Sequence, residues 1–414
     1  MKFGIFTNPA TPGVIPDGVR LAPIGRNNDR YQQLLEELKR ICFAAEDMGF
    51  DSFSTTEHHF HSEGIEMSVA PLLLYTDLAA RTKRIKFAPL AIVLTTRDPI
   101  RVAEELAVLD HLTKGRLMAG FARGYQDRWV SVLGQKYKVK GTQSDKSATN
   151  ERNRRLFEEN WHIIKAAWTQ DVLSYKGEFY EVPFPYEEGI RDWVLGDITR
   201  ERGAPGELDD EGVIRGVSVV PKPYQQPYPP VFMAFSLSET SIRFAAKEGM
   251  ISQIQVSNPE GFKRLCHVYQ EVAAENGREL KLGEQVAAPR YVYIGKTYEE
   301  ALQRAERTLG WQYDGYFGAF GFMEGFRNPE DPEEPKPLRF KNAHEVTKRL
   351  IEHQFALVGT VDDIKRQMES LARCHDNGEL EWFTFQLDQG YMPIEEAMDQ
   401  LEIFGTKIMP EFQG

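Results

Sequence analysis

The sequence predicts an α/β fold, a single (β/α)8 barrel of the TIM type that spans residues 1–414 and carries two insertions. Short apolar segments alternate with segments of helical period across short loops, which is the pattern of a parallel sheet covered by helices. The apolar segment 85–94 is nearly continuous, as expected for a strand buried on both faces. An open doubly wound sheet is the alternative, but no Gly-x-Gly-x-x-Gly motif follows the first strand to indicate dinucleotide binding.

The expected elements follow one another in a regular order. Asp29 is expected to cap the first long helix, which carries Leu34, Leu38 and Ile41 on one face and ends at Gly49. Eight strands are expected, at 2–7, 52–56, 85–94, 117–120, 231–234, 251–256, 287–294 and 382–387. Helices are expected at 29–48, 69–81, 98–112, 153–168, 239–248, 259–276, 298–309, 362–374 and 394–408.

Two stretches interrupt this order and are predicted to be insertions. The stretch at about 184–216 is acidic. The stretch at about 311–348 begins with aromatic residues and continues with alternating prolines and acids. Because long loops in a compact domain are usually functional or disordered, we expect the aromatic part to form a lid and the acidic part its solvated turn.

Composition excludes several classes of function. The net charge is −12, from 50 Lys+Arg and 62 Asp+Glu, and no basic stripe indicates nucleic-acid binding. The three cysteines, Cys42, Cys266 and Cys374, lie far apart, so neither a disulfide framework nor a cysteine metal site is expected. No apolar run approaches the roughly 20 residues of a membrane span. We therefore expect a cytoplasmic protein without a membrane or nucleic-acid partner.

The run Glu57-His58-His59 follows the second predicted strand, at the end of the barrel where catalytic groups usually lie. Imidazole and carboxylate groups exchange protons near neutral pH, so these residues are candidates for acid–base catalysis. A metal pair or a structural histidine is the alternative. Neighbouring side chains of a strand point to opposite faces, which argues against both histidines binding one metal.

Several short motifs, taken in order and with their spacing, resemble the bacterial-luciferase-like flavin monooxygenases. They are Met1–Gly4, Glu57–Phe60, Asp98–Arg101 running to Leu109-Asp110, Lys114–Leu117, Arg123-Gly124, Phe232–Ala234 with Ser238–Ser241, and Val358–Thr360. The resemblance implies reduced FMN (FMNH2) as cofactor, O2 as co-substrate and a separate flavin reductase that supplies FMNH2. It implies oxygenation of a small organic substrate, by hydroxylation or a Baeyer–Villiger reaction, through a flavin hydroperoxide. A homo-oligomer, most simply a dimer, is expected.

The resemblance also assigns roles near the flavin ring. His58 would lie beside the reacting flavin as acid or base, oriented by Glu57 or His59. Leu90-Ala91 would form a non-prolyl cis peptide in a bulge that supports the ring. Ala122 stands where luciferases carry a reactive but dispensable cysteine, so no essential step is in doubt.

A flavin phosphate needs anion-binding groups, and the sequence offers two sets. Ser238, Thr240 and Ser241 open a helix directly after a strand, where free N–H groups and hydroxyls can face an anion. A plain helix cap is the alternative. Arg123 ends the fourth strand and could pair with the phosphate, with a solvated arginine as the alternative. Arg154 is the choice for a second arginine, and Arg152 competes with it.

The substrate pocket is expected to be lined by Phe6, Asn8, Tyr125, Trp129 and Trp311, with ordinary core packing as the alternative. Two other functions compete with the monooxygenase. One is a deazaflavin-dependent oxidoreductase that transfers hydride on the same barrel. The other is a non-catalytic flavin-binding subunit, against which His58 and the phosphate serines argue.

Overall fold

The computed structural model describes residues 1–141 and 147–413, which fold into two compact units. The first unit holds residues 1–71, 81–91 and the chain from 231 onward, and the second holds 72–80 and 92–230. In the described residues, no helix is long and apolar enough to cross a membrane. Whether the chain is one domain, as the sequence predicts, stays a prediction.

The first unit is built on a parallel sheet in the order β3-β2-β1-β12-β10-β9-β8, with β11 paired to β10. Gly4 on β1 lies opposite Ser52 and Thr384, and a Cβ at Gly4 would lie 2.7 Å from the Ser52 Oγ. Only glycine therefore fits between these neighbouring strands. The strands are β1 (Lys2–Thr7), β2 (Ser52–Thr55), β3 (Lys86–Phe87), β8 (Val231–Ser236), β9 (Ile251–Ile254), β10 (Val286–Ile294), β11 (Ala356–Gly359) and β12 (Trp382–Leu387).

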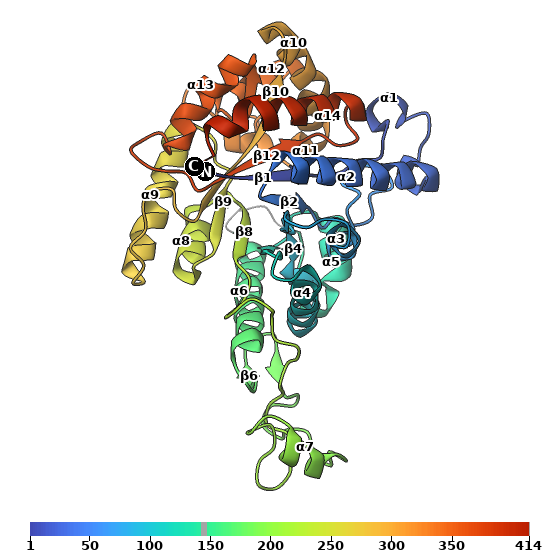
Figure 1. Cartoon of the computed structure of the whole chain (residues 1–414), viewed down its shortest axis with the longest axis vertical. Coiled ribbons are helices and arrows are strands. Elements are labelled where there is room, and N and C mark those ends of the chain that lie inside the picture. Colours follow the sequence, from blue (N-terminus) through green and yellow to red (C-terminus); the bar gives the residue numbers. More distant parts are fainter. Residues whose placement is uncertain (142–146, 414) are drawn as a thin grey trace. The chain divides into compact units, whose positions relative to one another are not determined.

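Helices cover this sheet, and α13 and α14 lie against β10 (Figure 1). Phe404 follows α14 and packs on the sheet, with its ring stacked 5.6 Å from that of Phe383. The α-helices of the first unit are α1 (Val14–Asp17), α2 (Asn28–Met48), α8 (Glu239–Glu248), α9 (Pro259–Glu275), α10 (Tyr298–Ala305), α11 (Phe317–Ala319), α12 (Ala343–Glu352), α13 (Val361–Ala372) and α14 (Ile394–Ile403). Its 3-10 turns are η1 (Ile24–Arg26), η6 (Phe322–Phe326) and η8 (Met409–Glu411), and its π-turns are η4 (Glu306–Gly310), η5 (Gln312–Tyr316) and η7 (Phe404–Ile408).

The second unit contains a parallel strand pair and an antiparallel hairpin. β4 (Ile92–Val93) pairs with β5 (Ala119–Ala122), and β6 (Tyr175–Lys176) pairs with β7 (Glu181–Val182). Helices α4 and α6 pack against one another. The acidic stretch at about 184–216 folds around the short α7 (Figure 1). The helices are α3 (Pro71–Ala79), η2 (Leu94–Thr96), α4 (Pro99–Thr113), α5 (Asp127–Leu133), η3 (Gln135–Tyr137), α6 (Ala148–Thr169) and α7 (Gly196–Arg202).

The α/β prediction is confirmed, but some of its details were wrong. The expected strand 85–94 is two strands, β3 and β4, and the first long helix is capped by Asn27, whose Oδ1 accepts a hydrogen bond from the Arg30 N–H at 3.0 Å. Asp29 instead lies in the first turn of α2, where a carboxylate suits the helix dipole. Neither α12 nor β11 was predicted, because the stretch before them is rich in proline and acidic residues.

Candidate functional site

The Glu57-His58-His59 run directly follows β2, as the sequence predicts, and its three side chains have different surroundings. Glu57 and His58 are buried, with 4% and 9% of their surface exposed. His59 Nε2 lies 3.3 Å from Glu57 Oε1, so this pair shares a hydrogen bond. The backbone N–H of His58 donates to the Ser68 carbonyl at 2.9 Å, which fixes the chain at the catalytic candidate.

A second carboxylate, Glu66, lies at the centre of this segment and was not singled out in the sequence. It is 1% exposed and adopts a positive φ of 53°. Its Oε1 lies 3.5 Å from His58 Nδ1, and its Oε2 lies 3.6 Å from His61 Nε2. Asn8 Nδ2 donates to Oε1 at 2.8 Å, and the Tyr316 hydroxyl donates to Oε2 at 2.6 Å. No local motif marks Glu66, because its partners come from three segments: the residue that follows β1, the loop that follows β2, and η5.

Burial and charge act in opposite directions on this cluster. Burial alone would raise the pKa of Glu66, but His58, His61 and the hydrogen bonds from Tyr316 and Asn8 outweigh it and hold that pKa below its ordinary value. Burial lowers the pKa of His58, and the Glu66 carboxylate only partly offsets this effect. The arrangement therefore favours an ionised carboxylate beside an imidazole that releases its proton readily.

The peptide bond between Leu90 and Ala91 is cis, which confirms the prediction for this pair. Both residues are buried, and the Leu90 N–H donates to the carbonyl of Thr55 on β2 at 2.9 Å. The bond thus lies beside the strand that leads into the Glu57-His58-His59 run. Its role toward a flavin ring stays a prediction.

The Ser238 segment forms the N-terminus of α8. Ser238 Oγ accepts a hydrogen bond from the Ser241 N–H at 3.3 Å and lies 3.0 Å from the Ser241 Oγ, while Thr240 is exposed. The acidic neighbour Glu239 pairs with Arg243 at 2.9 Å and with Arg264 at 2.7 Å. Its charge is thereby neutralised, so the first turn of the helix keeps its attraction for anions.

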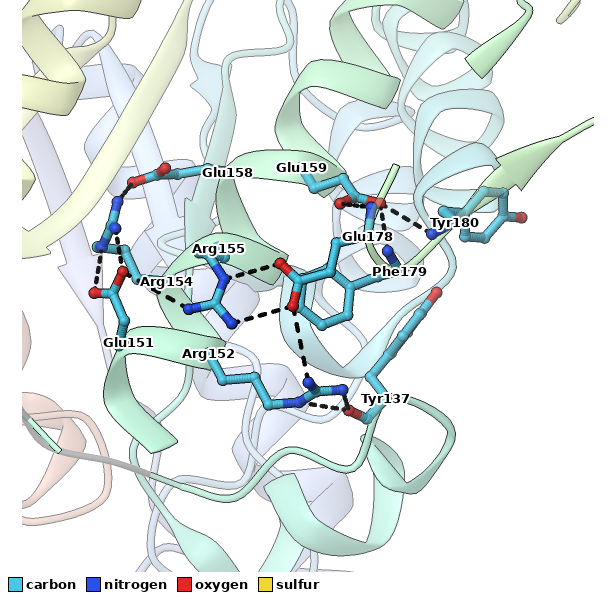
Figure 2. Close-up of polar contacts among 10 residues, drawn as sticks. All are labelled: Tyr137, Glu151, Arg152, Arg154, Arg155, Glu158, Glu159, Glu178, Phe179 and Tyr180. Atoms are coloured by element: carbon cyan, nitrogen blue, oxygen red, sulfur yellow. Dashed lines mark hydrogen bonds and ion pairs between the residues drawn. The ribbon is translucent and has the colours of Figure 1, made fainter. Parts of the chain in front are cut away.

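The predicted arginines lie in the second unit, where Arg123 Nη1 donates to Asn150 Oδ1 at 2.9 Å. Burial lowers the pKa of Arg123, and the nearby positive charge of Arg154 lowers it further. Arg154 itself is held by Glu151 and Glu158 on its own helix (Figure 2). Glu151 and Glu158 partly offset this effect on Arg123, so the two arginines and the two glutamates lie in one electrostatic network.

Arg152 lies on the same helix but has different partners. Its Nη2 donates to the Tyr137 carbonyl at 3.1 Å, and its guanidinium lies over the Phe179 ring at 4.8 Å (Figure 2). Like Arg152, Arg155 faces the turn that holds Glu178 and Phe179, and it pairs with Glu178 at 2.8 Å. Of the two competing arginines, Arg154 is therefore the one that acts electrostatically on Arg123.

The residues predicted to line a substrate pocket have varied environments. Phe6 is buried and meets the ring of Phe235 at 5.3 Å, and Asn8 accepts a hydrogen bond from Thr56 at 3.1 Å. The ring of Trp311 lies 6.2 Å from that of Tyr391. The Tyr125 hydroxyl accepts a hydrogen bond from Gln126, and Trp129 is 0% exposed in an apolar cluster. Contact of these five residues with a substrate stays a prediction.

The family model for luciferase-like monooxygenases matches residues 1–197 and 199–376. The chain belongs to the luciferase-like monooxygenase family. It is therefore an enzyme of the monooxygenase class, as the motifs predicted. In the described part of this family member, no group of three or more His, Cys, Asp or Glu side chains could hold a metal ion.

Three curated relatives show how far the likeness extends. The chain is 24% identical over 412 residues to 3,6-diketocamphane 1,6-monooxygenase of Pseudomonas putida, covering 95% of this chain and 97% of the relative. It is 23% identical over 390 residues to the oxygenase component of the flavin-dependent trigonelline monooxygenase of Acinetobacter baylyi, covering 92% and 91%. It is 29% identical over 259 residues to the alkanal monooxygenase alpha chain of Photobacterium leiognathi, covering 62% of this chain and 59% of that one.

Solved structures confirm the TIM-type barrel. The monooxygenase RslO1 of Streptomyces bottropensis superposes with a TM-score of 0.71 at 19% identity, covering 100% of both chains. The oxygenating constituent of 3,6-diketocamphane monooxygenase from Pseudomonas putida, solved with FMN, gives 0.70 at 20% identity, covering 100% of this chain and 99% of that one. The coenzyme F420-dependent tetrahydromethanopterin reductase of Methanopyrus kandleri gives 0.63 at 16% identity, covering 100% and 99%.

Proposed function

We propose that this chain is the oxygenase component of a two-component monooxygenase that uses FMNH2 and O2 to oxygenate a small organic substrate. The observation that carries the proposal is the buried Arg123, which hydrogen-bonds Asn150 and feels the charge of Arg154, because guanidinium groups are suited to binding a phosphate. Ser238, Thr240 and Ser241 supply hydroxyl and N–H groups of the same chemistry at the start of α8. Each of these two sets, taken by itself, offers groups that suit the phosphate of a flavin mononucleotide.

When bound, reduced FMN supplies the electrons that activate O2 for transfer of one oxygen atom to the substrate. The protein's part is to hold and move protons nearby. We propose that the ring of His58 accepts or donates the proton of the reacting group, and that Glu57 and His59 orient the segment through their shared hydrogen bond. Leu90 and Ala91 support the flavin ring.

The substrate side is proposed to consist of Phe6, Asn8, Tyr125, Trp129 and Trp311. Apolar rings exclude water, which protects a reactive oxygen species from decay to hydrogen peroxide. Hydroxylation and Baeyer–Villiger insertion both fit such a site. A separate flavin reductase is proposed as partner, because a relative of nearly equal length is named an oxygenase component. A homodimer is also proposed.

The test is oxygen uptake by the purified chain with FMNH2, measured with a panel of small ketones, aldehydes and aromatic compounds. We expect reduced FMN to bind better than oxidised FMN, and at least one compound to convert peroxide release into oxygenated product. His58→Ala should slow turnover by roughly 100-fold while the fold stays intact, the range for lost acid–base catalysis.

A hydride-transferring deazaflavin enzyme is the second candidate, because an F420-dependent reductase shares the fold. The same assay separates the two. Anaerobic reduction of a substrate with reduced deazaflavin, together with no binding of FMN in either redox state, would replace the first proposal with the second.

A further inference from the structure

Glu66 joins two parts of the first unit that the sequence treats separately. On one side its carboxylate faces His58 Nδ1 and His61 Nε2, at 3.5 and 3.6 Å. On the other side it accepts the hydrogen bond of the Tyr316 hydroxyl at 2.6 Å, and Tyr316 ends the π-turn η5. The carboxylate thus connects the candidate acid–base residue with the aromatic stretch that follows Trp311.

We propose that Glu66 is the positioning residue of His58, and that Tyr316 adjusts the basicity of the His58 imidazole through its hydrogen bond to the Glu66 carboxylate. Because the Glu66 carboxylate lies 3.5 Å from Nδ1, its negative charge favours a proton on that atom and leaves Nε2 as the atom that exchanges protons with the reacting group. This inference rests on the proposed function for the role of His58 in turnover. The link between Glu66, Tyr316 and His58 stands on geometry alone.

The physical link is the charge on one buried carboxylate. A hydrogen bond from Tyr316 draws negative charge toward Oε2, away from the Oε1 atom that faces His58. When that hydrogen bond is absent, more charge faces the imidazole and its proton is held more tightly. The position of the aromatic stretch therefore sets the basicity of His58. His58 is the weaker base when Tyr316 is hydrogen-bonded to Glu66.

Other titratable groups face the same carboxylate and are part of any pH response. Burial is the main cause of the raised pKa of each of three surrounding tyrosines, and the Glu66 charge adds to it; they are Tyr291, Tyr313 and Tyr391. Glu57 and His59 act on His58 from its own segment. None of these groups is changed in the variants below, so differences between variants report on Glu66 and Tyr316.

The test is a titration of the histidine rings by NMR in flavin-free protein labelled with 15N-histidine. The His58 signal is identified by its loss in His58→Asn. Glu66→Gln should lower the pKa of His58 by about one unit or more, the effect of removing a close opposite charge. Tyr316→Phe should move it the opposite way, upward, because the carboxylate then loses a donor. In wild-type protein the neutral ring should carry its proton on Nδ1.

Glu46→Gln is the matched control. Glu46 is also a buried carboxylate, but it accepts from the backbone N–H groups of Lys83 and Arg84 at 2.8 and 3.1 Å. Its substitution should leave the His58 titration unchanged. A His58 pKa that is the same in Glu66→Gln and wild type, or one that Glu66→Gln and Tyr316→Phe move in the same direction, would overturn the proposal. If Glu66→Gln does not fold, the Tyr316→Phe shift decides alone, and no upward shift there overturns it.

A kinetic measurement separates this inference from the proposed function. If the enzyme oxygenates a substrate, the limb of the pH–rate profile that belongs to His58 should shift in Glu66→Gln in the same direction as the NMR titration. If no oxygenation is found, the titration still decides the link, because it needs neither flavin nor substrate.

Discussion

Arg152 and Arg154 are separated by one position on α6, yet their side chains have different partners (Figure 2). Since Arg154 acts on Arg123 and Arg152 does not, we expect Arg154→Ala to weaken FMN binding by several-fold or more, as charge-assisted hydrogen bonds contribute about 1.5–3 kcal/mol each. Arg152→Ala is the control and should bind FMN as wild type does. Calorimetric titration with FMN and with riboflavin measures both, and equal losses for the two ligands would place the phosphate elsewhere.

Arg290 is a fully buried cation on β10 whose Nε and Nη2 atoms have no hydrogen-bond partner in the described structure. Nη1 donates to the Pro289 carbonyl, and the guanidinium lies 5.2 Å from the Phe262 ring. Burial lowers the pKa of Arg290 to about 9, so the charge is costly. We expect Arg290→Met to raise the free energy of unfolding by about 1–3 kcal/mol, measured by urea denaturation.

Arg278 provides the comparison for that substitution. Its Nη1 donates to Gln285 Oε1 at 2.6 Å, and a second hydrogen bond reaches the Ala246 carbonyl. Arg278→Met should therefore lower the stability. A loss of stability in Arg290→Met of similar size would show that the buried charge has a favourable partner.

At the scale of elements, the backbone of the turn between β6 and β7 is bound to α6 by the carboxylate of Glu159 (Figure 2). Glu159 accepts hydrogen bonds from the backbone N–H groups of Glu178, Phe179 and Tyr180, at 2.8, 2.9 and 2.9 Å. Glu159→Ala leaves three N–H groups without an acceptor and should lower the free energy of unfolding by about 3 kcal/mol or more. Urea denaturation and hydrogen exchange at these three amides measure the effect.

Glu178→Ala is the control for the hairpin. Glu178 and its partner Arg155 have 45% and 43% of their side-chain surface exposed, so solvent screens their ion pair and its loss should leave stability nearly unchanged. If Glu159→Ala were equally harmless, the turn would be held by its own backbone hydrogen bonds.

The elements also show how far sequence reasoning reaches. The place of His58 followed from the rule that catalytic groups lie after barrel strands, and the structure puts it directly after β2. Glu66 could not be found this way, since its partners Asn8 and Tyr316 are brought to it only by the fold. The cis bond at Leu90-Ala91 came from the family resemblance, because no local feature of two non-proline residues indicates it.

For the whole molecule, buried histidines predict how stability depends on pH. Burial lowers the pKa values of His58 and His353 and, together with the charge of Arg290, lowers that of His375 to about 4. The unfolded chain takes up protons near the ordinary value of 6.5, before the folded chain does. The contribution of these histidines to the free energy of unfolding should therefore be fully present above about pH 6.5 and be lost as the pH drops toward 4.

Denaturant unfolding at intervals between pH 7.5 and 4.5 measures this loss. His375→Asn should make the dependence shallower by about 1–2 kcal/mol over that range, allowing for the partial exposure of the ring. Asparagine suits the positive φ of 53° at this position. The same slope in wild type and His375→Asn would mean that carboxylates account for the whole effect.

The division into two units has a spectroscopic consequence. Of the six tryptophans, four lie in the second unit, namely Trp129, Trp161, Trp168 and Trp193. The rings of Trp161 and Trp168 lie 6.4 Å apart, and both are packed against Tyr228. Indole fluorescence therefore reports more on the unit that holds Arg123 than on the unit that holds His58, which contains only Trp311 and Trp382. An emission-monitored melting curve therefore follows mainly the unit of the proposed phosphate arginines, whereas Trp311, which packs against the same cluster as Tyr316, is the indole that lies near the histidine network.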